Sequence, residues 1–153
     1  MMSTADTAVR LTRTIAAPPA RVYRAWLDPE LLRQWMAAGN NSVLRAEVDE
    51  RPGGRLSIWQ TAAGEDSGGF ECEIVELVRD ERIVFTWRFV GPQREDPGAD
   101  SHLTVTLREV PEGTELTLVH ARLGALRAAM PYTADKVEAG WAMALDNLEA
   151  VFA

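Results

Sequence analysis

Cysteine and lysine are nearly absent from this sequence, which contains one of each, Cys72 and Lys136. A single cysteine excludes a disulfide bond within the chain and is typical of proteins from a reducing compartment. The first ten residues lack a basic segment followed by an apolar core, so they do not predict a secretory signal. No apolar run approaches the ~20 residues that a membrane-spanning helix needs. We therefore expect a cytoplasmic protein.

The sequence also lacks an excess of positive charge. It has 16 lysine and arginine residues against 23 aspartate and glutamate residues, which gives a formal net charge of −7. Binding to nucleic acid or to anionic lipid needs a basic face, so neither nucleic acids nor membranes are expected as partners. Arginine supplies almost all of the positive charge, and the base composition of the genome explains this more simply than anion recognition by guanidinium groups does.

The length and composition predict one domain with one hydrophobic core. The chain has 153 residues, of which 46% are hydrophobic and 25% are charged, as in ordinary globular proteins. Residues 1–7 are expected to form a short tail, and residues 8–153 a single domain.

The N-terminal part of this domain predicts a strand followed by two short helices. Residues 9–15, VRLTRTI, alternate as a strand does, with Arg13 as a charged residue in the otherwise apolar phase. Residues 17–35, APPARVYRAWLDPELLRQW, predict the two helices, because Asp28 and Pro29 are a typical cap and first-turn residue for the second one.

The middle of the sequence predicts an antiparallel meander of strands joined by short polar turns. ERPGG at residues 50–54 is interpreted as a hairpin turn, and the turn at residues 110–113 should pair Glu109 with Thr114. A change of phase near Val75 predicts a β-bulge. The expected strands are residues 42–49, 55–60, 70–78, 82–90, 101–110 and 113–121.

The C-terminal segment predicts one long helix from about Ala134 to Phe152, with Thr133 as its N-cap. Its apolar residues recur with the spacing of one buried face. Gly140 within this helix costs about 1 kcal/mol relative to alanine. We expect the glycine to let the helix backbone approach the sheet while Trp141 becomes buried, which removes ~200 Å² from water and offsets that cost.

The order of these elements is that of the helix-grip pattern. The motifs APPARVYRAWLDPELLRQW, ERPGG, ERIVFTWRF, EGTELTLVH and EAGWAMALDNLE resemble those of the SRPBCC or START-like superfamily, specifically bacterial single-domain members of the activator of heat-shock protein 90 ATPase homologue (Aha-type) family. The resemblance runs from about Val9 to Phe152. It implies an α+β helix-grip (START/Bet v-like) fold, in which a curved antiparallel sheet wraps around a long C-terminal helix and two short helices follow the first strand.

The resemblance implies three kinds of function. The superfamily contains cup-shaped binders of small apolar molecules, aromatic polyketide cyclases and a eukaryotic activator of a heat-shock chaperone's ATPase. That activator has a second, N-terminal domain that binds the chaperone, and we expect no counterpart here because the first strand starts near Ala8. Binding of a small apolar or aromatic ligand is the leading hypothesis. A chaperone-activating interaction and a cyclase- or hydrolase-like activity in the same cavity are the alternatives, and a homodimer stays open.

The candidates for ligand contact are aromatic and apolar residues in the expected inward phases. On the strand at residues 82–90, Phe85, Trp87 and Phe89 share one phase, which forms either ordinary core or the wall of a cavity beneath the C-terminal helix. The candidate ligand-binding residues are Trp35, Phe70, Phe85, Trp87, Phe89, Leu103, His120, Trp141 and Leu145.

Few residues are candidates for acid–base or metal chemistry. The pairing expected across residues 110–113 places His120 on the inward face opposite Leu103, and His102 on the outward face, so a two-histidine metal site is not expected. His120 is a histidine hydrogen-bonded within the core, a polar anchor for a ligand, or a weak candidate for a general base. Cys72 is expected to point inward as a small apolar residue. We expect neither a metal nor a cofactor.

Segments rich in glycine or small residues are expected to be loops that frame an opening, and they are residues 36–41, 61–69 and 91–100. Residues 122–133 connect the last strand to the last helix. Leu123, Leu126 and Met130 in this connection are candidates for a lid over the cavity.

Overall fold

The computed structural model describes residues 8–37, 41–94 and 98–153 of the chain. The tail predicted at residues 1–7 lies outside the described residues, as do the central parts of the loops predicted at residues 36–41 and 91–100.

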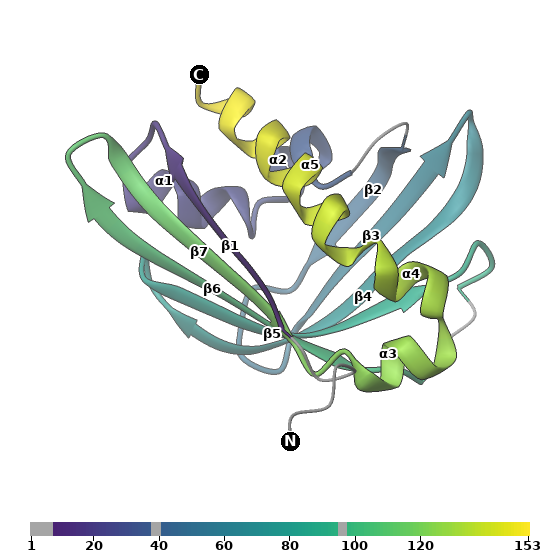
Figure 1. The fold of residues 1–153 in the computed structure, drawn as a ribbon. Coiled ribbons are helices and arrows are strands. Elements are labelled where there is room, and N and C mark those ends of the chain that lie inside the picture. The colour runs from purple at the N-terminus through teal and green to yellow at the C-terminus, as the bar shows by residue number, and fades with distance from the viewer. Residues whose placement is uncertain (1–7, 38–40, 95–97) are drawn as a thin grey trace.

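One antiparallel sheet contains the seven strands of the described residues, in the order β1-β7-β6-β5-β4-β3-β2. The sheet curls into a half-barrel, and the C-terminal helix lies along its concave side (Figure 1). This arrangement confirms the predicted α+β helix-grip fold. The strands are β1 Val9–Ile15, β2 Asn41–Val48, β3 Arg55–Ala62, β4 Glu65–Val78, β5 Arg82–Val90, β6 Ser101–Val110 and β7 Gly113–Ala121.

The strand registers follow the predicted phases. Glu109 pairs with Thr114 and Leu103 with His120, as expected from the turn between β6 and β7. The register of β4 against β5 shifts between Ile74 and Glu76, which confirms the β-bulge predicted there. The apolar sides of the strands therefore face the helix together.

Residues 61–69 are not the loop that their small residues predicted. β3 continues to Ala62 and β4 begins at Glu65, so a two-residue turn joins two long strands. Ala63 and Gly64 both have positive φ angles, 53° and 83°, as a type I′ hairpin turn requires. An alanine at the first of these positions gives little signal for such a turn, because it rarely adopts positive φ.

The two short helices predicted after β1 are present, and Asp28 caps the second one by accepting a 2.9 Å hydrogen bond from the backbone N–H of Glu30. The prediction of one long helix from Ala134 was wrong in its first turn. Thr133 lies inside α4, and Lys136 separates α4 from α5 because its backbone leaves the helical region. The helices are α1 Pro19–Ala25, α2 Pro29–Trp35, α3 Gly124–Ala129, α4 Pro131–Asp135 and α5 Val137–Val151.

Arg13 has a structural reason for its place in an apolar phase of β1. Its guanidinium lies 2.5 Å from a carboxylate oxygen of Asp146 and 2.9 Å from one of Glu149, both on α5. The Arg13 side chain is only 24% exposed, whereas those of Asp146 and Glu149 are 67% and 41% exposed, so water and salt screen the carboxylate side of both pairs. Arg13 thus ties the C-terminal half of α5 to the edge strand of the sheet.

The hydrophobic core lies between α5 and the concave side of the sheet. Trp141 is 6% exposed, and its ring centroid lies 5.2 Å from that of Trp87 on β5. This contact confirms the prediction that Trp141 packs against the sheet. Leu145 and Leu148 continue the same helix face and are fully buried.

Candidate functional site

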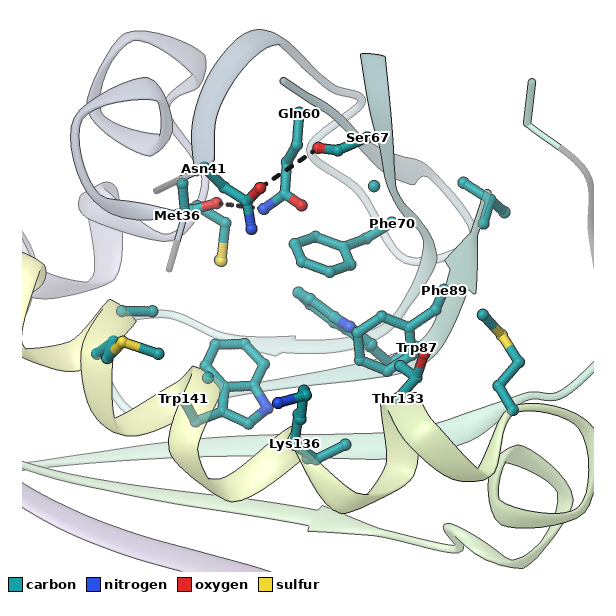
Figure 2. A pocket seen from close by; sticks show the side chains of 18 of the residues that line it. Met36, Asn41, Gln60, Ser67, Phe70, Trp87, Phe89, Thr133, Lys136 and Trp141 are labelled. Carbon is teal, nitrogen blue, oxygen red and sulfur yellow. Dashed lines mark hydrogen bonds between the residues drawn. The ribbon is translucent and has the colours of Figure 1, made fainter. Parts of the chain in front are cut away.

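A cavity of about 550 Å³ opens where α4 and the first turns of α5 meet the ends of β3, β4 and β5 (Figure 2). A volume of this size is within the range of small-molecule sites. Its walls come from segments far apart in the sequence, since the meander and the last helices face each other across it. The lining residues are Met36, Ala37, Asn41, Gln60, Ser67, Gly69, Phe70, Trp87, Phe89, Val90, Gly91, Pro92, Met130, Tyr132, Thr133, Lys136, Val137, Ala139, Gly140, Trp141, Met143 and Ala144.

Four of the predicted ligand-binding residues line this cavity and form a continuous aromatic wall. The ring centroid of Phe70 lies 5.0 Å from that of Trp87 and 5.3 Å from that of Phe89. Trp141 extends the wall from the helix side, next to Trp87. Rings at these separations offer a planar ligand several faces and edges against which to pack.

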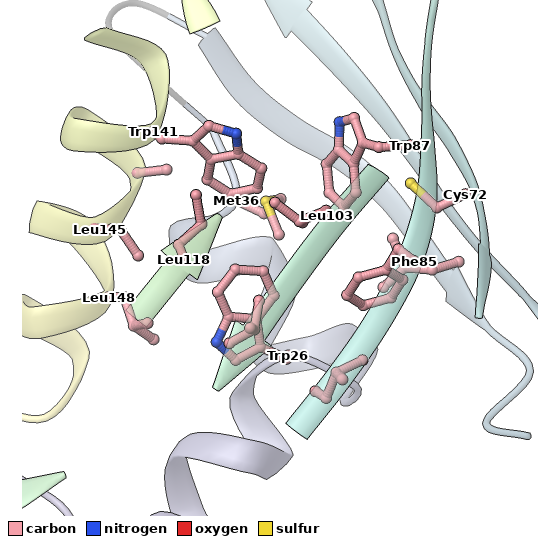
Figure 3. Packing of buried hydrophobic residues seen from close by; sticks show 14 of the residues in the cluster. Trp26, Met36, Cys72, Phe85, Trp87, Leu103, Leu118, Trp141, Leu145 and Leu148 are labelled. Atoms are coloured by element: carbon pink, nitrogen blue, oxygen red, sulfur yellow. The ribbon is translucent and has the colours of Figure 1, made fainter. Parts of the chain in front are cut away.

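The other five predicted residues lie behind the cavity in the fully packed core, and they are Trp35, Phe85, Leu103, His120 and Leu145. Figure 3 shows Phe85, Leu103 and Leu145 on the side of Trp87 and Trp141 that faces Trp26. Trp35 packs edge-on against Trp26 at 4.7 Å, and its indole N–H donates to the carbonyl of Ala25 at 2.9 Å.

His120 is fully buried, and both of its ring nitrogens are hydrogen-bonded. The indole N–H of Trp141 lies 3.0 Å from Nδ1, which must accept because an indole nitrogen can only donate. Nε2 therefore carries the proton and donates to Ser101 Oγ at 2.6 Å. The Ser101 hydroxyl in turn donates to the carbonyl of Trp87 at 2.8 Å.

This chain of hydrogen bonds keeps His120 neutral. Burial, with a smaller contribution from the charge of the nearby His102, lowers the pKa of His120 to about 4. A protonated Nδ1 would also direct its N–H at the indole N–H of Trp141. The arrangement fits the interpretation of His120 as a core histidine, whose role is to hold Trp141 at the cavity wall.

Sequence reasoning missed the polar part of the lining. Gln60 Nε2 donates to the carbonyl of Met36 at 3.3 Å, and Ser67 Oγ donates to Asn41 Oδ1 at 3.5 Å. Figure 2 shows Asn41, Gln60 and Ser67 on the side of the cavity opposite Trp141. One signal was available, because Gln60 is a polar residue in the buried phase of β3.

Gly140 does not have the role that the sequence predicted. A Cβ atom built at this glycine meets no atom within 4 Å outside its own helix neighbourhood, so the helix backbone makes no close approach there. Gly140 instead lines the cavity, on the same helix face as Val137 and Ala144. Its missing side chain leaves part of the cavity empty.

The predicted lid residues divide between core and cavity. Leu123 and Leu126 are buried in the hydrophobic core, whereas Met130 lines the cavity at the end of α3. The segment that carries them is helical, since α3 and α4 occupy most of it. Of the three predicted lid residues, Met130 alone is therefore in a position to cover a ligand.

Other reactive groups of the described residues lie away from the cavity. Cys72 is buried as predicted, and burial raises the pKa of its thiol well above the usual value. Glu71 pairs with Arg94 at 2.9 Å, and Glu115 pairs with Arg108 at 3.0 Å, on the outward side of the sheet. Across the same part of the chain, no group of three or more His, Cys, Asp and Glu side chains is placed to hold a metal ion.

None of the helices described is long and apolar enough to span a membrane.

The curled sheet, the long helix across it and the cavity between them define a helix-grip protein. Residues 16–153 match the family described as "Activator of Hsp90 ATPase homolog 1-like protein", and the chain belongs to this family. A crystal structure of a protein from Chromobacterium violaceum is 32% identical, covers 95% of this chain and 97% of its own, and superposes with a TM-score of 0.75.

Two more distant structures share the fold. The AHSA1 protein from Silicibacter pomeroyi is 22% identical, with a TM-score of 0.77 over 94% of this chain and 96% of that one. A protein from Arthrobacter aurescens is 17% identical, with a TM-score of 0.80 over 99% of this chain and 89% of that one. No curated protein matches the chain at a significant level.

Proposed function

We propose that this protein binds a small apolar or aromatic molecule in the cavity between the sheet and α5, without transforming it. The observation that carries the proposal is the aromatic wall of Phe70, Trp87, Phe89 and Trp141 around about 550 Å³ of space. Sites for small molecules combine such apolar walls with a few polar groups that orient the ligand, which here come from the strand ends.

The chemistry of the lining favours binding over catalysis. Among the described lining residues there is no carboxylate and no histidine, and the titratable side chains that do line the cavity, Tyr132 and Lys136, are both exposed. His120, the candidate base, lies behind Trp141 with both nitrogens already in hydrogen bonds. A cyclase or hydrolase with this lining would therefore depend on Tyr132 and Lys136 alone for acid–base chemistry.

The test is a titration with the neutral apolar dye N-phenylnaphthylamine, which becomes fluorescent in apolar surroundings and absorbs tryptophan emission. We expect saturable binding of one dye per chain, quenching of tryptophan emission and a higher melting temperature, because a ligand that binds only the folded state stabilises it. A titration without saturation, or with no effect on the melting temperature, contradicts the proposal.

A matched pair of variants locates the binding. Gly140→Leu places a bulky side chain in the open space of the cavity and should weaken dye binding at least about tenfold. Glu138→Leu adds a similar side chain on the same helix, at an exposed position outside the cavity lining. It should leave binding unchanged. Equal effects of the two variants would place the dye elsewhere.

A further inference from the structure

The charged and hydrogen-bonding groups of the cavity are unevenly distributed. Lys136 is the only charged side chain among the described lining residues. It is also the only lysine in a chain of net charge −7. Because the described lining presents one cation and no anion, the cavity should favour an anionic ligand over a cationic one.

Lys136 is held at the cavity by the local structure. It lies at the junction of α4 and α5, and its Nζ is 4.7 Å from the centre of the Tyr132 ring, within the range of a cation–π contact. Figure 2 shows Lys136 on the same side of the cavity as Trp141. Within the described residues, no carboxylate forms an ion pair with this ammonium group, whereas Arg127 of α3 pairs with Asp135 of α4 at 2.9 Å.

The indole of Trp87 belongs to the same lining. The indole N–H of Trp87 is buried and has no hydrogen-bond partner among the described residues. Buried donors are normally satisfied, and leaving one unpaired costs free energy. Figure 3 shows the nitrogens of Trp87 and Trp141 on the side of the rings away from Trp26. That of Trp141 donates to the buried His120, and the indole N–H of Trp26 in the core is likewise unpaired within the described part of the chain, so the unpaired indole of Trp87 does not by itself indicate a ligand.

We infer that the ligand of this cavity is an amphipathic anion, with an aromatic or alicyclic body and a single carboxylate or sulfonate group that pairs with Lys136. The inference rests on the proposed function, since it names the class of ligand for the same cavity. The aromatic wall contacts the body of the ligand, and the ammonium group of Lys136 pairs with its anionic group. The amides of Asn41 and Gln60 are neutral and add hydrogen bonds without favouring either sign of charge.

The experiment compares two dyes that share one aromatic skeleton and differ in a sulfonate group. Anilinonaphthalenesulfonate is anionic, and N-phenylnaphthylamine is its neutral counterpart. Competition between the two dyes restricts the measurement to the shared site. We expect the wild type to bind the anionic dye about threefold to tenfold more tightly, with a preference that declines in about 0.5 M salt, because Lys136 is exposed and its pairing is screened.

Three variants assign this preference to one side chain. Lys136→Met keeps most of the length of the side chain without its charge, and should abolish the preference while the neutral dye still binds within about twofold of the wild type. Lys136→Arg should retain the preference. Arg55→Met removes an exposed charge at the other end of β3 and should change neither affinity.

The outcomes separate the two proposals. Binding of the neutral dye without an anion preference, or a preference that survives in Lys136→Met, overturns the inference and leaves the proposed function in place. Loss of both dyes in Lys136→Met also overturns it, because Lys136 would then support the cavity itself rather than select an anion. Failure of both dyes to bind the wild type overturns the inference and the proposed function together.

Discussion

Protonation of His120 is linked to the stability of the fold, because this buried ring accepts a hydrogen bond from Trp141 of the aromatic wall. Its pKa is about 4 in the folded chain, against about 6.5 in the unfolded chain. The folded state therefore stays neutral while the unfolded state gains a proton as the pH falls below 6.5. The contribution of neutral His120 to stability should be present above pH 6.5, and the free energy of unfolding should decrease by about 2 kcal/mol between pH 7 and pH 5.

Urea denaturation at the two pH values measures this decrease. His120→Gln is the matched variant, since its amide can accept from Trp141 and donate to Ser101 while it has no titratable group. Between pH 7 and pH 5, the free energy of unfolding of this variant should decrease by about 2 kcal/mol less than that of the wild type. His102→Gln, on the outward side of β6, should keep most of the pH dependence of the wild type, because His102 makes the smaller contribution to the lowered pKa of His120. A His120→Gln profile parallel to that of the wild type would contradict the assignment.

Gly140 is a second residue whose effect is measurable alone. Because the position is open, Gly140→Ala should raise the free energy of unfolding by about 1 kcal/mol through helix propensity, with dye binding retained. Ala139→Gly, the reverse exchange at the neighbouring exposed position, should lower stability by a similar amount. A destabilised Gly140→Ala protein would mean that the helix is in fact closely packed at this position.

At the scale of the elements, the sequence predicted best what depends on alternation. Strand phases, the bulge near Val75 and the pairing of Glu109 with Thr114 follow from which side chains avoid water, and all of them are confirmed. The turn at Ala63 and the helix break at Lys136 were missed. Each depends on the backbone angles of one residue, which tertiary contacts can impose on a side chain that gives no local signal.

The sequence predicted which side of β5 faces the C-terminal helix, but not which residues on that side line the cavity. Phe85, Trp87 and Phe89 alternate on one side of β5, so the sequence assigned them one role. In the structure Phe85 lies in the core, whereas Trp87 and Phe89 reach the cavity. The difference depends on where α5 begins along the sheet, and alternation within a strand contains no information about the position of a helix on top of it.

At the scale of the whole molecule, β1 and β2 are neighbours in sequence but lie at opposite edges of the sheet. The chain between them, with α1 and α2, crosses from one edge to the other (Figure 1). β1 then pairs with β7, from Val9 opposite His120 to Ile15 opposite Thr114. Every other pairing in the described sheet joins strands that follow each other directly in the sequence.

This connectivity has a consequence for the order in which the protein folds. The hairpins of the meander close short loops, whereas β1 must close roughly 100 residues of chain to reach β7, and the entropy lost rises with loop length. The meander should therefore form in the transition state and β1 should join it afterwards. Leu11→Ala on β1 should speed unfolding with little change in the folding rate, whereas Leu107→Ala on β6 should slow folding, as stopped-flow kinetics in urea will measure. If Leu11→Ala instead slows folding, β1 is already paired at the barrier and the rate-limiting event is closure of the whole sheet.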